Sequence, residues 1–398
     1  MSLAHTSVIV HSAQSVDAGG IVDDAWLLAS DDRIVETGTG SGWRALAAEI
    51  GMHGGRGQLD LVDGSGLRLV PGFIDLHAHG GGGHSFDDGA AEIAAAVAVH
   101  RAHGTTRSVI SLVANPLPAL EQSLGAVASL AEGDPLVLGA HLEGPFLAPS
   151  RKGAHNPSFL IAPTPDAVSR LIEAGRGHLR QVTIAPELPG GLDAIDRFVA
   201  AGVVVAVGHT EASAEQAREA FDRGATLLTH AFNAMPGLGH REPGPVAAAL
   251  ADPRVVLELI VDGVHVHPDV VRLAFGAAPG RIALITDAMA AAGSRDGHYR
   301  LGTLDVEVAD GRAVLAGTAT IAGSTLTLDA ALREATAASG IDVVAAVTAL
   351  TATPARALGR AGDLGLLRPG HAADLVLLTP DGRPRHVFAA GARIPTPA

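Results

Sequence analysis

The stretch of sequence that decides the fold is Val70-Pro71-Gly72-Phe73-Ile74-Asp75-Leu76-His77-Ala78-His79, followed by four glycines at 80–83. Its apolar first part predicts a strand. Residues two apart on a strand share a face, so His77 and His79 point the same way at its end. Two neutral imidazoles side by side suit a borderline divalent metal, and the glycines let the backbone pass close to it. The alternative is a strand tip with two histidines and no metal.

Apolar segments of this kind recur along the chain, each bounded by Gly, Pro or polar residues. The eight predicted strands are 69–75, 106–113, 136–142, 182–186, 203–208, 226–230, 255–261 and 282–286. Helical patterns lie between them at 91–103, 118–131, 164–174, 212–223 and 268–277. Near-continuous Val, Ile and Leu runs are typical of parallel strands buried on both faces. Eight strand–helix units predict an α/β fold, a (β/α)8 TIM-type barrel, over residues 69–358.

The two ends of the chain have a different pattern. Residues 1–68 and 359–398 contain short alternating strands such as Ser7–Val10, Trp26–Ala29 and Ala373–Leu378. We expect these ends to pair into one small β-sandwich, because isolated hairpins are marginally stable. The alternative is two independent flaps on the barrel. Residues 296–317 predict a hairpin inserted after the eighth strand.

Composition narrows the class of protein. The 398 residues are 47% hydrophobic and 18% charged, an ordinary globular balance. Acidic residues exceed basic ones by 42 to 28, which argues against nucleic acid or an anionic membrane as a partner. There is no cysteine, so there is no disulfide, thiolate ligand or thiol nucleophile. Without a signal-like N-terminus or a membrane-length apolar run, we expect a cytoplasmic protein.

The predicted strands share polar residues at their ends, where a TIM barrel carries its chemistry. Six of the eight end in histidine or a carboxylate, and these residues are His77, His79, His141, Glu143, His209, His230, Asp262, His265 and Asp287. Core packing does not explain such a set, so we predict a metal-dependent hydrolase site. A metal held by imidazole and carboxylate lowers the pKa of water, and a nearby carboxylate can act as general base. Asp287, on the last strand, is the candidate base.

Four further motifs carry a resemblance. They are His-Leu-Glu-Gly-Pro-Phe at 141–146, Lys-Gly-Ala-His-Asn-Pro at 152–157, His-Ala-Phe-Asn-Ala-Met at 230–235 and Thr-Asp-Ala-Met at 286–289. With the Pro-Gly-x-x-Asp entry to the first strand and the Arg-Pro-Gly-x-x-Ala-Asp-Leu ending, the chain resembles the amidohydrolase superfamily. Within that superfamily it resembles the N-acetylglucosamine-6-phosphate deacetylases over nearly its whole length.

The resemblance implies roles for individual residues. Glu143, His209 and His230 would bind the catalytic metal, Asp287 would be the acid and base, and His155 would support the oxyanion. The residues implied to contact the substrate are Ala154, His155, Asn233, Ala234, Arg241, Asp262, His265, Ile321, Ala322 and Gly323. Among these, Arg241 and His265 would hold the 6-phosphate, unless Arg241 merely forms a surface ion pair. The pocket would lie near a homodimer interface, so one phosphate contact could come from the neighbouring subunit.

The number of metals stays open at one or two. Many superfamily members bridge two metals through a carbamylated lysine on the fourth strand, but the only lysine here is Lys152, and the fourth strand ends in Glu187. That leaves Glu143 as the candidate shared ligand. His77 and His79 favour a second site, and Zn²⁺ or Fe²⁺ suits such ligands. His141 is expected in the barrel interior and His84 in a loop. The histidines expected to be solvated are His100, His103, His178, His298 and His386.

The implied activity is hydrolysis of the linear amide of N-acetyl-D-glucosamine 6-phosphate to glucosamine 6-phosphate and acetate. One alternative is a deacetylase for another phosphorylated amino sugar, such as the galactosamine epimer, since one hydroxyl distinguishes the two. A cyclic-amide hydrolase or deaminase would have no use for Arg241. A non-catalytic sugar-phosphate binding protein would have no use for a base at Asp287.

Overall fold

The barrel is an eight-stranded parallel sheet. In the computed structural model, which describes residues 6–52 and 58–396, its strands are β6 (Phe73–Asp75), β9 (Thr105–Val113), β10 (Val137–Glu143), β11 (Leu179–Ile184), β12 (Val204–Val207), β13 (Leu227–Leu228), β14 (Val256–Ile260) and β15 (Ile282–Ile285). Nearly every residue in them is buried, as expected for strands covered on both faces. The predicted barrel is confirmed.

The barrel closes between its first and last strands through residues just beyond them. Ala78 and Ala288 form a parallel bridge, and the backbone N–H of Asp287 donates to the carbonyl of His77 at 2.8 Å. Lower in the barrel, the Thr286 hydroxyl donates to the Asp75 carboxylate at 2.7 Å. Asp75, which belongs to the Pro-Gly-x-x-Asp motif, therefore joins the two strands whose ends carry His77 and Asp287.

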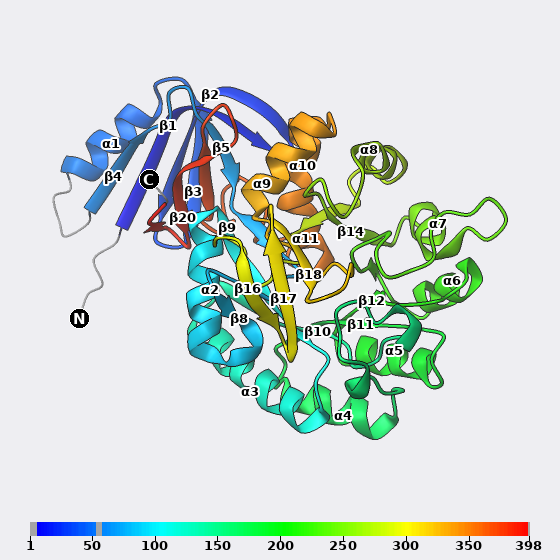
Figure 1. Ribbon diagram of the computed structural model, residues 1–398. Coiled ribbons are helices and arrows are strands. Elements are labelled where there is room, and N and C mark those ends of the chain that lie inside the picture. The colour runs from blue at the N-terminus through cyan, green and yellow to red at the C-terminus, as the bar shows by residue number, and fades with distance from the viewer. Residues whose placement is uncertain (1–5, 53–57, 397–398) are drawn as a thin grey trace.

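Helices alternate with the barrel strands and cover the outside (Figure 1). They are α2 (Ala90–Ala102), α3 (Leu117–Gly133), α4 (Pro165–Ala174), α5 (Gly191–Ala200), α6 (Ala214–Asp222), α7 (Gly244–Ala251), α8 (Pro268–Ala277), α9 (Leu328–Arg333), α10 (Val343–Leu350) and α11 (Ala352–Ala357). All five predicted helices are present, with ends displaced by at most two residues. A Ser213–Gln216 capping box begins α6. In the described part of the chain, no helix combines the length and apolarity needed to cross a membrane.

The prediction for the first barrel strand was wrong. The single strand expected over 69–75 is two strands that belong to different sheets: β5 (Arg68–Pro71) pairs with β19 (Leu375–Leu378), and only β6 enters the barrel. Gly72 lies between them, and a Cβ there would come within 2.2 Å of the Thr106 hydroxyl oxygen. The chain thus passes from one sheet to the other at a residue that has room for no side chain.

The two ends of the chain form one small sheet domain, as predicted (Figure 1, upper left). Its other strands are β1 (Thr6–Asp17), β2 (Gly20–Ser30), β3 (Arg33–Thr39), β4 (Gln58–Asp63), β20 (Pro384–Ala389) and β21 (Ala392–Ile394), with α1 (Trp43–Met52) beside β4. The edge strand β3 also contacts the segment before β19, since the backbone N–H of Ile34 donates to the carbonyl of His371 at 2.8 Å. Residues 1–5, 53–57, 397 and 398, which fall within the expected terminal segments, lie outside the described residues.

A buried ion pair joins this domain to the barrel. Arg107 on β9 donates to both oxygens of Asp374, at 2.6 and 3.2 Å, and to the carbonyl of Pro135 at 2.6 Å. Both charged residues are only 6% exposed. Asp374 belongs to the Ala-Asp-Leu motif near the C-terminus, so that motif has a structural role at the domain junction.

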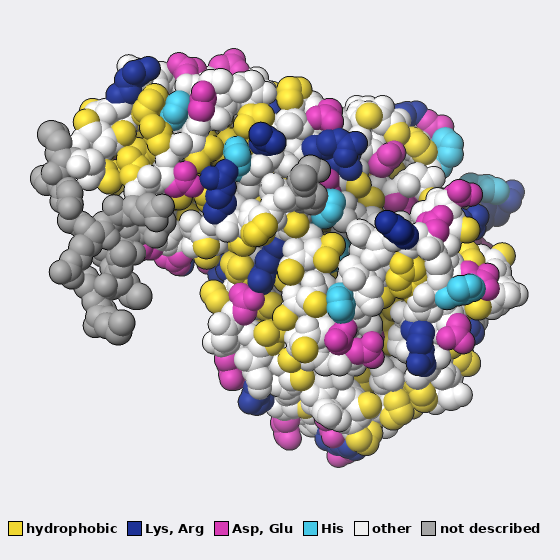
Figure 2. Space-filling model, turned by 60° about the vertical axis from the view of Figure 1, so that its left-hand side comes forward, with side chains coloured by type: hydrophobic (Ala, Val, Ile, Leu, Met, Phe, Trp, Pro, Cys, Tyr) yellow, Lys and Arg dark blue, Asp and Glu magenta, His cyan; other side chains and the backbone are white. Residues whose placement is uncertain are grey.

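A separate three-stranded sheet follows β15. Its strands are β16 (Gly297–Leu301), β17 (Leu304–Ala309) and β18 (Arg312–Leu315), where the sequence predicted a two-stranded hairpin. The short Asp310–Gly311 turn adds the third strand. On the face seen in Figure 2, Lys and Arg side chains are scattered among Asp and Glu, so that face has no extended basic surface.

Candidate active site

Glu143, at the end of β10, lies at the centre of the polar cluster. Its Oε1 is 3.1 Å from Nε2 of His209 and 3.0 Å from Nε2 of His230. The same two imidazole nitrogens are 3.0 Å apart. Neighbouring ligands around a small divalent cation are separated by about 3.0–3.4 Å, given bonds of about 2.0–2.1 Å. Glu143, His209 and His230 thus have the mutual spacing of a ligand set.

The strand-one histidines and Asp287 form a second group of potential metal ligands, which also contains Glu143. His79 Nε2 is 3.1 Å from Glu143 Oε2 and 3.3 Å from Asp287 Oδ1. His77 Nε2 is 3.3 Å from Glu143 Oε1 and 3.5 Å from the same Asp287 oxygen. Glu143 thus contacts both groups: His79 lies nearest to its Oε2, whereas His77, like His209 and His230, lies nearest to its Oε1. His77 and His79 lie on the same side, as their spacing predicted.

Sharp backbone turns aim several of these side chains inward. His209, His230 and Asp287 each lie two residues beyond the ends of β12, β13 and β15, and all three have positive φ, at 47°, 26° and 48°. Non-glycine residues adopt this region rarely, at a cost of about 1–3 kcal/mol, and such residues cluster at functional sites. Gly323 lies against one of them, since a Cβ on it would come within 2.8 Å of the Asp287 carbonyl oxygen.

The tautomer of His209 is fixed by its surroundings. Its Nδ1 lies 2.7 Å from the carbonyl of Arg151, which only accepts hydrogen bonds, so Nδ1 carries the proton. A neutral His209 then presents an Nε2 lone pair to the Glu143 carboxylate, an arrangement that is repulsive unless a cation lies between them. This arrangement fits a bound divalent cation.

The carboxylates of Glu143 and Asp287 also favour positive charge between them and the histidines. Burial opposes protonation of His79, but its hydrogen bonds to Asp287 and Glu143 raise its pKa to about 9. Burial would raise the pKa of Asp287, yet the charge of His77 and the hydrogen bond from His79 lower it to about 2. A divalent cation can supply the same charge in place of these protons.

His155 differs from the other four histidines around Glu143. Its Nε2 is 3.2 Å from Glu143 Oε2, so its position alone would allow it to bind a metal with Glu143 and His209. However, the backbone N–H of Ala114 donates to its Nδ1 at 3.2 Å. Burial lowers the pKa of His155 to about 4, so the ring is neutral and its proton lies on Nε2. A protonated Nε2 is a hydrogen-bond donor and not a metal ligand.

The cluster opens into a cavity of about 400 Å³. The predicted substrate residues that line it are Ala154, His155, Asn233, Ala234, His265, Ile321 and Gly323. Ala322 is buried behind this wall, and Asp262 acts through His265, whose Nδ1 lies 2.7 Å from its carboxylate. Arg241 does not line the cavity. It lies exposed in the loop before α7, with Nη1 2.7 Å from Nε2 of His240.

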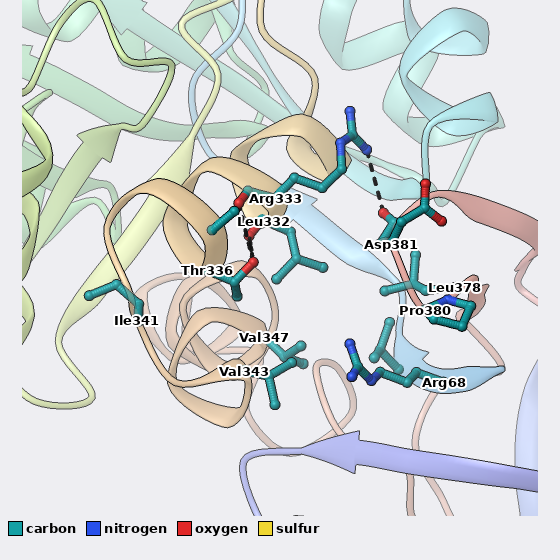
Figure 3. Close-up of a pocket in the computed structure, with 13 residues that line it drawn as sticks. Arg68, Leu332, Arg333, Thr336, Ile341, Val343, Val347, Leu378, Pro380 and Asp381 are labelled. Atoms are coloured by element: carbon teal, nitrogen blue, oxygen red, sulfur yellow. Dashed lines mark hydrogen bonds between the residues drawn. The ribbon is translucent and has the colours of Figure 1, made fainter. Parts of the chain in front are cut away.

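A larger cavity, of about 510 Å³, lies between the small domain and helices α9 and α10 (Figure 3). Apolar side chains such as Leu332 and Val347 form its walls, and Arg333 is already paired with Asp329 at 2.7 Å. No group of potential metal ligands is found there among the described residues. The chemistry therefore belongs to the smaller cavity.

Sequence reasoning missed or misassigned three residues. Arg151 lines the cavity from the Arg-Lys-Gly loop, paired with Glu211 at 2.7 Å. Glu258 is fully buried in β14, and a lone acid in the apolar run 255–261 was the available signal. His100 was expected to be solvated, but it is buried. Its Nε2 lies 2.8 Å from the carbonyl of Gly80, in space left by the side-chain-free Gly81.

His141 lies in the barrel interior, as expected. Its two ring nitrogens lie 2.9 Å from the Ser111 hydroxyl and 2.8 Å from the Thr183 hydroxyl. Burial is the main cause that holds its pKa well below the usual value. His141 is thus a neutral, hydrogen-bonded core residue beneath the cluster.

A TIM barrel with convergent imidazoles and carboxylates at the carboxyl ends of its strands defines the class of metal-dependent barrel hydrolases. The chain belongs to the amidohydrolase family, whose model matches residues 68–394.

Individual members of this family are similar to the chain over most of its length. The chain is 42% identical, with a TM-score of 0.89, to a mutant N-acetyl-D-glucosamine-6-phosphate deacetylase from Mycobacterium smegmatis solved in complex with N-acetyl-D-glucosamine 6-phosphate. That comparison covers 99% of this chain and 100% of the other. It is 41% identical to the N-acetylgalactosamine-6-phosphate deacetylase of Escherichia coli O157:H7, over 78% of this chain and 83% of the relative. It is 36% identical to the N-acetylglucosamine-6-phosphate deacetylase of Danio rerio, over 84% and 86%.

Proposed function

We propose that this chain hydrolyses the acetamide of N-acetyl-D-glucosamine 6-phosphate, giving D-glucosamine 6-phosphate and acetate. The observation that carries the proposal is the single cavity in which the Glu143 cluster, Asp287 and a neutral His155 meet. The relatives named above support the substrate class. A cytoplasmic location is part of the proposal, because a sugar phosphate carries charge that does not enter a lipid bilayer readily.

Glu143, His209 and His230 are proposed to hold one divalent cation. His77 and His79, again with Glu143, are proposed to hold another. The mixed imidazole and carboxylate ligands suit Zn²⁺ or Fe²⁺. A divalent cation in such a site lowers the pKa of water toward neutrality and polarises the amide carbonyl.

Asp287 and His155 carry out the proton and charge chemistry in this proposal. Asp287 accepts a proton from the attacking water as a carbon–oxygen bond forms at the acetyl carbonyl. The Nε2–H of His155 donates to the oxyanion that develops there. Asp287 then delivers its proton to the amide nitrogen, the carbon–nitrogen bond breaks, and the amine leaves as acetate is released.

The phosphate end of the substrate is proposed to be held by His265 and Arg241. Hydrogen bonding and charge interaction with Asp262 outweigh burial and raise the pKa of His265, which favours its cationic form. Arg241 offers a planar donor fork suited to phosphate oxygens. Since Arg241 lies outside its own cavity, we propose a homodimer in which its loop reaches the cavity of the neighbouring subunit.

N-acetylgalactosamine 6-phosphate is the second candidate substrate, supported by the 41% identity to a deacetylase of that name. The two sugars differ in one hydroxyl configuration, whose recognition depends on few hydrogen bonds.

Acetate release from four compounds tests the proposal: both N-acetyl sugars, each with and without the 6-phosphate. We expect the phosphorylated glucosamine derivative to have the highest kcat/KM, about 10² or more above its unphosphorylated form, since charge-assisted hydrogen bonds contribute about 1.5–3 kcal/mol each. Arg241→Ala should remove most of that preference. A higher kcat/KM for the galactosamine epimer would establish the second candidate, and no acetate from any of the four would refute both.

A further inference from the structure

Glu258 is a buried acid that the proposed reaction does not use. It lies in the middle of β14 with no exposed surface, on a strand that is otherwise apolar. Its Oε1 accepts a hydrogen bond from Nε2 of Gln181 at 2.8 Å. Its Oε2 lies 3.4 Å from Nδ1 of His77 and 3.4 Å from the backbone N–H of His230. The Glu258 carboxylate therefore lies directly behind two of the histidines around Glu143.

No permanent cation compensates this charge. Among the buried side chains in the described part of the chain, Arg107 is the only Lys or Arg, and it is paired with Asp374. Glu143, Asp287 and Glu258 thus lie in one barrel interior, in which Asp75 is also buried. Burying a charge is costly unless an opposite charge is close. Divalent cations held by the cluster around Glu143 would supply such charge.

The geometry distinguishes His77 from its neighbour. With its Nδ1–H directed at Glu258, a neutral His77 presents the lone pair of Nε2 to the space between Glu143 and Asp287. Nδ1 of His79 has no hydrogen-bond partner among the described residues. A carboxylate behind a ligating imidazole fixes the ring and raises its basicity. Of the strand-one pair, only His77 has this support.

We infer that Glu258 is a positioning residue that orients His77 and thereby sets the affinity of the second cation site. The inference rests on the metal assignment in the proposed function. It assigns Glu258 no contact with substrate and no part in the first site beyond a long backbone contact.

Titration of metal-stripped, full-length protein with Zn²⁺ against a chromophoric chelator tests the inference without measuring activity. The parent should bind two Zn²⁺ per chain. Glu258→Gln keeps the shape but loses the charge, and it should weaken the second site by about 10–100-fold while leaving the first unchanged. In a His77→Ala background, adding Glu258→Gln should cause no further change, because the residue that Glu258 orients is already absent.

A matched control removes a buried carboxylate elsewhere. Asp329→Asn, on α9, should lower stability but leave both Zn²⁺ affinities as in the parent, which separates metal positioning from general destabilisation. Should Glu258→Gln fail to fold, Glu258→Asp keeps the charge but withdraws it from His77, and a selective loss at the second site is again expected.

Three results would overturn the inference: a parent that binds one Zn²⁺, equal weakening of both sites, or unchanged affinity in the Glu258 variants. The first, together with normal acetate release, would leave the proposed function intact. A parent that binds no Zn²⁺ and releases no acetate would remove both.

Discussion

The backbone N–H of Ala114 donates a hydrogen bond to Nδ1 of His155 across 3.2 Å, and this contact separates His155 from the other histidines around Glu143. His155→Asn should therefore lower kcat by about 10²–10³, the cost of losing an oxyanion donor, and leave the metal content unchanged. Steady-state kinetics with elemental analysis on the same samples checks both. Loss of metal in this variant would mean that His155 is a ligand.

Asparagine has the shape of aspartate but cannot accept a proton, so Asp287→Asn tests the role of Asp287 as the base. Asp287→Asn should reduce turnover by about 10² or more with metal retained, because the variant can neither take the water proton nor protonate the leaving amine. The comparison is acetate release at saturating substrate. Near-parental turnover would show that another group is the base.

His265 predicts a pH dependence. Its pKa is raised from 6.5, so the cationic form is present at low pH and is lost as pH rises through the raised value. The ratio of kcat/KM for phosphorylated over unphosphorylated sugar should therefore fall as pH rises through this raised pKa, at a higher pH than for an ordinary histidine. The ratio removes pH effects common to both substrates. His265→Asn should give a smaller and flatter ratio, and a parental ratio that rises with pH would contradict the assignment.

The sequence predicted the barrel well because its strands are buried on both faces. Such strands are long apolar runs, which can be recognised from the sequence alone. It also placed His77, His79, Glu143 and Asp287 together, since strand ends meet at one rim. It failed at 69–75, because Val70 pairs with Val376, some 300 residues along the chain. Neither periodicity nor spacing marks such a partner.

Other parts of the site depended on neighbours that no local pattern encodes. The tautomer of His155 is set by the backbone of Ala114. The burial of His100 follows from the missing side chain at Gly81. Glu258 was visible as an acid in an apolar run, but its proposed role depends on the contact with His77, which the sequence does not show.

The Arg107–Asp374 pair predicts a stability effect at the domain junction. Asp374→Ala leaves a buried guanidinium unpaired and should lower the free energy of unfolding by about 3–5 kcal/mol. Denaturant unfolding measures this. An Arg107→Met/Asp374→Leu double variant should recover most of the loss, and Arg218→Ala, at an exposed pair, should change nothing. A single Asp374 variant as stable as the parent would show that the pair does not hold the domains together.

The most direct test asks whether the cluster around Glu143 is a metal centre that hydrolysis requires. Full-length protein is stripped with a chelator, Zn²⁺ is added back in steps, and bound metal and acetate release from N-acetylglucosamine 6-phosphate are measured on each sample. Stripped protein should release acetate at background level, and activity should return as Zn²⁺ fills the site, but not in a Glu143→Gln variant. Parental activity in protein that contains no detectable metal would contradict the proposed site.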